Sequence, residues 1–179
     1  LGNSMAVPVI RWLGQRVEAS RPKKALPSML DPCCGSKMFY FDKSDSRVLF
    51  GDIRQEQHTL CDGRTLSILP DQRMDFRDLP FSDESFNVVS FDPPHLRKAG
   101  ENGWQGKKYG ILSDDWREDL RQGFAECFRV LKKDGVLVFK WNETQIKVSE
   151  ILDLTDKKPV LGHRSGKHNK THWILFIKD

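Results

Sequence analysis

Residues 86–95 contain a short apolar run, Phe-Asn-Val-Val-Ser-Phe, that stops at Asp92 and is followed by two prolines. The run is too short for a helix, and its β-branched and aromatic side chains suit a pleated strand. Proline has no N–H to donate to a sheet ladder, so the strand must end at Asp92. Ligands bind at the carboxyl ends of strands in open α/β sheets. The segment therefore predicts a buried strand with a carboxylate and rigid carbonyls at a binding edge; the alternative is a plain turn capped by Asp92.

Two other segments repeat this pattern of an apolar strand that ends in an acid. In 28–36, the strand ends at Asp31, and a turn of small residues follows that lets a ligand approach the backbone closely. In 47–52, the strand ends at Asp52, roughly twenty residues after that turn, which suits an acid that binds ribose hydroxyls. Three such strand ends at one sheet edge indicate a nucleoside cofactor site.

These motifs resemble those of the class I S-adenosylmethionine-dependent methyltransferases, from about residue 27 to the C-terminus. The turn 31–36 is similar to the family's Asp-Pro-x-x-Gly-Ser first motif, common among enzymes that methylate amino groups of nucleobases. Residues 92–95 resemble the Asp-Pro-Pro-aromatic catalytic motif, with His95 in place of the usual aromatic residue. Lys37 stands where a further glycine is often found. The resemblance implies a single Rossmann-like α/β domain over 1–179, with a mostly parallel seven-stranded sheet, an antiparallel last strand and helices on both faces.

The resemblance also implies S-adenosylmethionine as the cofactor and assigns roles to residues. Asp52 corresponds to the acid that holds the cofactor ribose, while Asp75 and Phe76 inherit the adenine contact. The candidate cofactor-binding residues are Asp31, Pro32, Cys33, Gly35, Asp52, Ile53, Asp75, Phe76 and Asp92. The candidate catalytic residues are Asp92, Pro93, Pro94 and His95.

The predicted activity is methyl transfer to an exocyclic amino group of a nucleobase in DNA or RNA. Asp92 and the Pro93 carbonyl would accept hydrogen bonds from that amine. His95 would stack on the base or bond to it, or it points to solvent as a turn residue. A small-molecule or protein acceptor and a non-catalytic cofactor-binding module remain as alternatives.

Composition favours a soluble cytoplasmic domain. The chain has 179 residues and a formal net charge of +4, with no apolar run near the roughly 20 residues that span a bilayer. The four cysteines lack zinc-site spacing and are expected to be reduced thiols, and the histidines predict no metal site. Residues 1–4 precede Met5 like a cloning remnant and are left out of the functional argument.

Two stretches combine cations with groups that bind nucleic acid. The segment 96–112 interleaves four glycines and several Lys and Arg residues with Trp104 and Tyr109. Cations pair with phosphates and aromatic rings stack on unpaired bases, so this loop predicts contact with single-stranded or flipped-out nucleic acid, or else forms a solvated lid. A second basic stretch covers 157–178. We expect no separate target-recognition domain, which would favour a targeting partner protein, recognition by short loops or a structured RNA.

Apolar periodicity and turn signals predict the remaining elements. They are helices over 7–19, 113–133 and 142–154, strands over 136–141 and 172–178, and a hairpin at 59–66 around Asp62-Gly63.

Overall fold

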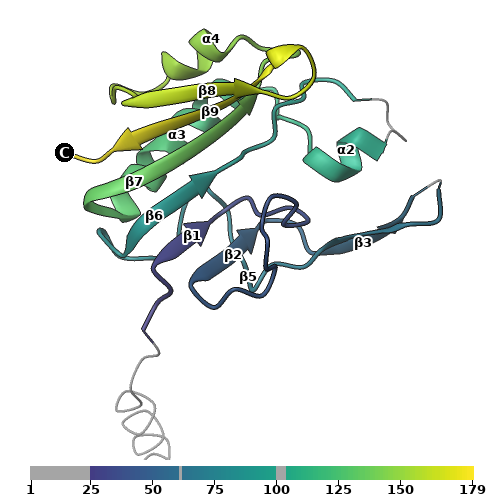
Figure 1. The fold of residues 1–179 in the computed structure, drawn as a ribbon, viewed down its shortest axis with the longest axis horizontal. Coiled ribbons are helices and arrows are strands. Elements are labelled where there is room, and N and C mark those ends of the chain that lie inside the picture. The colour runs from purple at the N-terminus through teal and green to yellow at the C-terminus, as the bar shows by residue number, and fades with distance from the viewer. Residues whose placement is uncertain (1–24, 61, 100–103) are drawn as a thin grey trace, which may run out of the picture.

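The computed structural model describes residues 25–60, 62–99 and 104–179. Seven strands in these residues form one sheet in the order β5-β2-β1-β6-β7-β9-β8 (Figure 1). They are β1 (Met29–Asp31), β2 (Val48–Asp52), β5 (Gln72–Arg73), β6 (Phe86–Phe91), β7 (Leu131–Asn142), β8 (Leu161–Ser165) and β9 (Thr171–Ile177). The first five pair in parallel, whereas β9 runs antiparallel to both of its neighbours. The predicted mostly parallel sheet with an antiparallel last strand is confirmed.

The core lies between helix α3 (Trp116–Val130) and one face of the sheet. Alternate side chains of β7 are fully buried on this face, as the two-residue period of a strand requires. The ring of Phe124 on α3 lies 5.5 Å from that of Phe91 and 5.0 Å from that of Phe139, measured between centroids. This aromatic packing fixes α3 across β6 and β7.

A two-stranded hairpin connects β2 to β5, as predicted from Asp62-Gly63. It consists of β3 (Glu56–Thr59) and β4 (Thr65–Ile68), which pair antiparallel. Gly63 adopts a φ of +80°, which a residue with a side chain rarely adopts, and the Asp-Gly pair therefore suits the turn. The hairpin projects away from the sheet (Figure 1).

Some local predictions were wrong. The helix predicted over 142–154 is only α4 (Val148–Leu152), because β7 continues to Asn142 and the Asn142 side chain accepts a hydrogen bond from the backbone N–H of Thr144 in a turn. The segment 96–112 is not all loop, since it contains α2 (Trp104–Tyr109). Strand β8 and the short 3₁₀ helix Lys167–Asn169 lie in the second basic stretch, where no element was expected before 172.

The helix predicted over 7–19 lies outside the described residues. Within the described part of the chain, no helix is long and apolar enough to cross a membrane.

The carboxyl ends of β1, β2, β6 and β7 meet at one edge of the sheet, since these strands are parallel neighbours.

Candidate active site

A cavity of about 550 Å³ lies at this edge of the sheet, within the ordinary size range of ligand pockets. Most of the residues predicted from the sequence line it: Pro32, Cys33, Gly35, Asp52, Ile53, Phe76, Asp92, Pro93, Pro94 and His95. Asp31 and Asp75 do not. The parallel strands therefore bring together motifs whose residues are up to 63 positions apart, from Pro32 to His95, as expected for a site at strand ends.

Asp31 is completely buried beneath the turn that follows β1. Its Oδ2 accepts a hydrogen bond of 2.8 Å from the hydroxyl of Tyr40, and its Oδ1 accepts one of 3.0 Å from the backbone N–H of Cys33. Burial disfavours the ionised carboxylate and raises the pKa of Asp31 to about 7, although both hydrogen bonds oppose the shift. Asp31 thus holds the turn in place and is poised to change charge near neutral pH.

This pKa predicts how the stability of the protein depends on pH. A carboxyl group with a raised native pKa stabilises the fold at low pH, and that contribution is lost as the pH rises through about 7. Asp31→Asn cannot ionise, so its stability relative to the wild type should increase from about pH 4 to about pH 7, by at most about 1.4 kcal/mol per pH unit, and level off above that range. Thermal unfolding of both proteins across this range measures the difference. The exposed Asp114→Asn serves as the control, and a pH-independent difference for Asp31→Asn would contradict the assignment.

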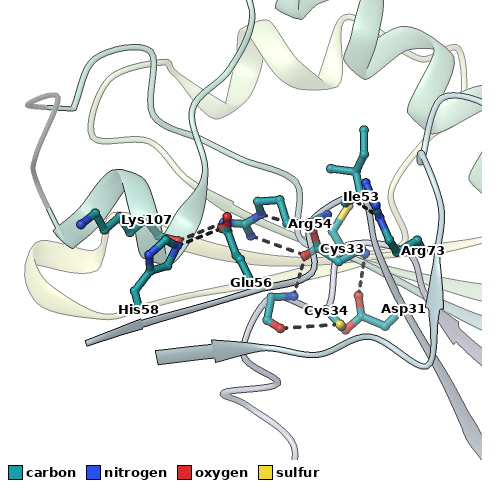
Figure 2. Close-up of polar contacts among 11 residues, drawn as sticks. Asp31, Cys33, Cys34, Ile53, Arg54, Glu56, His58, Arg73 and Lys107 are labelled. Atoms are coloured by element: carbon teal, nitrogen blue, oxygen red, sulfur yellow. Dashed lines mark hydrogen bonds and ion pairs between the residues drawn. The ribbon is translucent and has the colours of Figure 1, made fainter. Parts of the chain in front are cut away.

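Asp52 is buried, and its hydrogen bonds with Arg54 lead on to Lys107 of α2; Arg54 and Lys107 are labelled in Figure 2. Its Oδ2 accepts a hydrogen bond of 2.9 Å from the N–H of Gly35, which fixes the first turn to the end of β2. Its Oδ1 accepts hydrogen bonds from the backbone N–H and the Nε of Arg54, at 2.9 and 3.2 Å. Arg54 Nη1 in turn donates to the carbonyl of Lys107 on α2 at 3.0 Å. One guanidinium therefore joins the predicted ribose-binding acid to α2.

The fold places only one residue of the predicted adenine-binding pair, Asp75 and Phe76, in the cavity. Phe76 lines the cavity and packs its ring against Phe91, with centroids 5.5 Å apart. Asp75 instead pairs with Arg77 at 2.6 Å, and the hydrogen bonds from Arg77 lower the pKa of its carboxyl group. Of the two residues, Phe76 is the one placed to contact a bound ligand.

Asp92 faces a cation that the sequence analysis did not single out. Parallel pairing of Phe91 with Phe139 sets the next residues, Asp92 and Lys140, side by side, and Lys140 Nζ lies 2.5 Å from Asp92 Oδ2. Burial raises the pKa of Asp92, while the charge and hydrogen bond of Lys140 oppose that rise. Both side chains line the cavity. The predicted catalytic acid is thus half of an ion pair.

His95 lies in an aromatic corner of the cavity. Its ring centroid is 5.3 Å from that of Tyr109 on α2 and 6.3 Å from that of Trp141. Burial, with a smaller contribution from Lys140, lowers the pKa of His95 to about 4, so the imidazole is neutral at neutral pH. A neutral ring beside other rings can stack or hydrogen bond but cannot supply a charge.

The end of α2 packs against the candidate catalytic residue Pro94. Gly110 follows α2 with a φ of +75°, and a Cβ at this position would lie 3.1 Å from Pro94 Cγ. A side chain there would push α2 outward. The glycine therefore allows Tyr109 to reach His95.

Solved structures of other proteins are similar to this chain over nearly its whole length. No model of a known protein family matches the chain, and no curated protein matches it. The PH0226 protein from Pyrococcus horikoshii OT3 is similar with a TM-score of 0.55 and 15% identity, over 99% of this chain and 93% of that one. A TehB-like SAM-dependent methyltransferase from Corynebacterium glutamicum is similar with a TM-score of 0.51 and 14% identity, over 97% of each chain. The fold is that of the S-adenosylmethionine-dependent methyltransferases.

Within this methyltransferase fold, the hydrogen-bond partners of the three acids were not identified from the sequence. Tyr40, Arg54 and Lys140 bind the carboxylates of Asp31, Asp52 and Asp92 respectively. Lys140 could have been found, because it lies at the carboxyl end of a predicted strand, as the three acids do. Tyr40 and Arg54 lie in irregular segments, where no periodicity indicates the direction of a side chain.

Proposed function

We propose that this chain is an S-adenosylmethionine-dependent methyltransferase that modifies an exocyclic amino group of a nucleobase in DNA or RNA. The observation that carries the proposal is the placement of Asp92. This carboxylate directly follows β6 and lines the cavity beside the rigid Pro93 and Pro94, together with residues of the turn that follows β1. An amine that enters the cavity can donate to Asp92 and to the Pro93 carbonyl.

The residues present fit the cofactor. The turn 33–36 combines small side chains with a φ of +50° at Gly35, which leaves room for a ligand near the backbone. Asp52 and Phe76 line the same cavity and would hold the ribose hydroxyls and the adenine ring. Because Arg54 already donates to both carboxylate oxygens of Asp52, the ribose would have to share that carboxylate with the guanidinium or displace it.

In methyl transfer, the main task of the chain is to position the acceptor. Bound S-adenosylmethionine supplies a methyl group that its sulfonium has already activated. Asp92 orients the acceptor amine, and it is the nearest group to take the proton that the amine loses. The neutral His95 ring offers the acceptor base a stacking face next to Tyr109.

The distribution of basic residues supports a nucleic-acid acceptor. Helix α2 places Lys107 and Lys108 in its last turn, and Lys108 lines the cavity. The turn between β8 and β9 carries the exposed Lys167 and Lys170 and leads into Thr171, which also lines the cavity. The two basic stretches therefore flank the cavity from different elements, as phosphate contacts on either side of a target base would require.

Labelled transfer tests the proposal directly. The protein is incubated with S-adenosylmethionine carrying a labelled methyl group and, separately, with DNA, transfer RNA, ribosomal RNA, protein and metabolite pools. We expect label in a nucleic-acid pool, in a form released by nucleases as a methylated base. Label confined to the metabolite or protein pool would contradict the choice of acceptor. Failure to bind the cofactor in calorimetry would contradict the enzyme class.

A further inference from the structure

The polar side chains that line the cavity differ in how many of their hydrogen-bonding groups already have partners within the protein. Gln145 accepts from the N–H groups of Arg97 and Lys98 and donates to the Lys98 carbonyl at 2.8 Å, so it holds the wall of the cavity. Asn142 donates to Thr171 Oγ1 at 3.1 Å and accepts from the Thr144 N–H. Both amides already hydrogen-bond to other parts of the protein through their oxygen and their nitrogen.

The Asp92–Lys140 pair has hydrogen-bond donors and acceptors that are not used within the pair. Within the described residues, Lys140 donates to Asp92 Oδ2 alone, and Asp92 Oδ1 accepts no hydrogen bond. An ammonium group has three N–H donors and a carboxylate oxygen has two acceptor positions, so both groups can bind a further partner. The rings of Phe39 and Trp173 lie 5.4 and 5.6 Å from Lys140 Nζ and confine the ammonium to this position. A donor and an acceptor therefore stand side by side at the place where the methyl acceptor is expected.

We infer that Lys140 is a specificity-determining residue. It donates a hydrogen bond to a ring nitrogen of the acceptor base, the nitrogen that lies next to the amino group bound by Asp92. The inference rests on the proposed function and narrows its substrate class. Adenine and cytosine each present an amino group next to a ring nitrogen that accepts, which matches the acceptor of Asp92 and the donor of Lys140. A protonated alkylamine offers donors only and has no ring nitrogen that accepts, so the remaining Lys140 donors would stay unpaired in a half-buried site.

Substrates that differ in one ring atom test this role. Single-stranded oligonucleotides carry either adenine or 1-deazaadenine, and either cytosine or 3-deazacytosine, so that CH replaces the ring nitrogen beside the amino group. For the base that is methylated, the wild type should lose about 10- to 100-fold in kcat/KM with the deaza analogue, because a half-buried Lys140 donor is left unpaired. In Lys140→Met, which has no donor, the two substrates should agree within about threefold. Lys140→Gln keeps a neutral donor and should retain part of the discrimination.

Controls separate this role from a structural one. The exposed Lys133 lies on the same strand, and Lys133→Met should discriminate like the wild type. Equal rates for the wild type on the paired substrates, or undiminished discrimination in Lys140→Met, would overturn the inference and leave the proposed function standing. Absence of label from every oligonucleotide would overturn both. If Lys140→Met does not fold in thermal unfolding, the ratio measured for the wild type still decides.

Discussion

Asp92→Ala is expected to reduce methyl transfer by about 100- to 10,000-fold, the usual contribution of a side chain that takes part in proton transfer and orients the reacting group. S-adenosylmethionine should still bind within about tenfold of the wild type, because the lost hydrogen bonds belong to the acceptor and strengthen only during transfer. Single-turnover transfer and calorimetry measure the two quantities. If Asp92→Ala keeps full activity on an identified acceptor, the catalytic assignment is wrong and the motif at 92–95 is only a structural turn.

Two further variants refine this experiment. Asp92→Asn keeps an oxygen that accepts from the amine but loses the charge that pairs with Lys140, and should therefore be more active than Asp92→Ala. Asp114 is exposed just before α3, and Asp114→Ala should behave like the wild type. If Asp92→Asn and Asp92→Ala are equally inactive, the negative charge rather than the acceptor oxygen is essential.

Phe124→Ala should cost about 3 to 5 kcal/mol of stability, the usual loss when a buried phenylalanine is truncated and leaves a cavity. Phe124 is 1% exposed and packs against the rings of Phe91, Phe139 and Phe176. Such a loss is a large part of the 5 to 15 kcal/mol by which domains are typically stable. Denaturant unfolding measures it. Phe41→Ala removes the same ring from a fully exposed position and should change stability by less than about 0.5 kcal/mol; equal effects of the two substitutions would contradict the observed packing.

The strands that carry the site could be predicted from the sequence because their signals are local. A β-branched or aromatic run that meets an acid and then Pro or small residues has few ways to continue, and this placed Asp31, Asp52 and Asp92 at strand ends. The turn at Asp62-Gly63 and the stripe of helix α3 follow from equally local rules.

The short elements were less predictable. The helix expected over 142–154 failed because Asn142 and Thr144 bond to each other in a turn, an alternative to the helix that apolar periodicity does not reveal. Strand β8 has mostly exposed side chains, and so it shows no alternation of apolar and polar residues. Its place at the edge of the sheet is set by pairing with β9.

The sequence by itself determined which acids end the strands and that those strands form a parallel sheet with a ligand edge. Only the tertiary structure decided which groups face these acids. Lys140 reaches Asp92 across 48 positions because β6 and β7 pair in a particular register, and Tyr40 reaches Asp31 through an irregular segment. Register and burial depend on how the whole core packs, whereas the end of a strand depends on a few neighbouring residues. The charge states of Asp31, Asp92 and His95 follow from that packing, since burial is what shifts their pKa values.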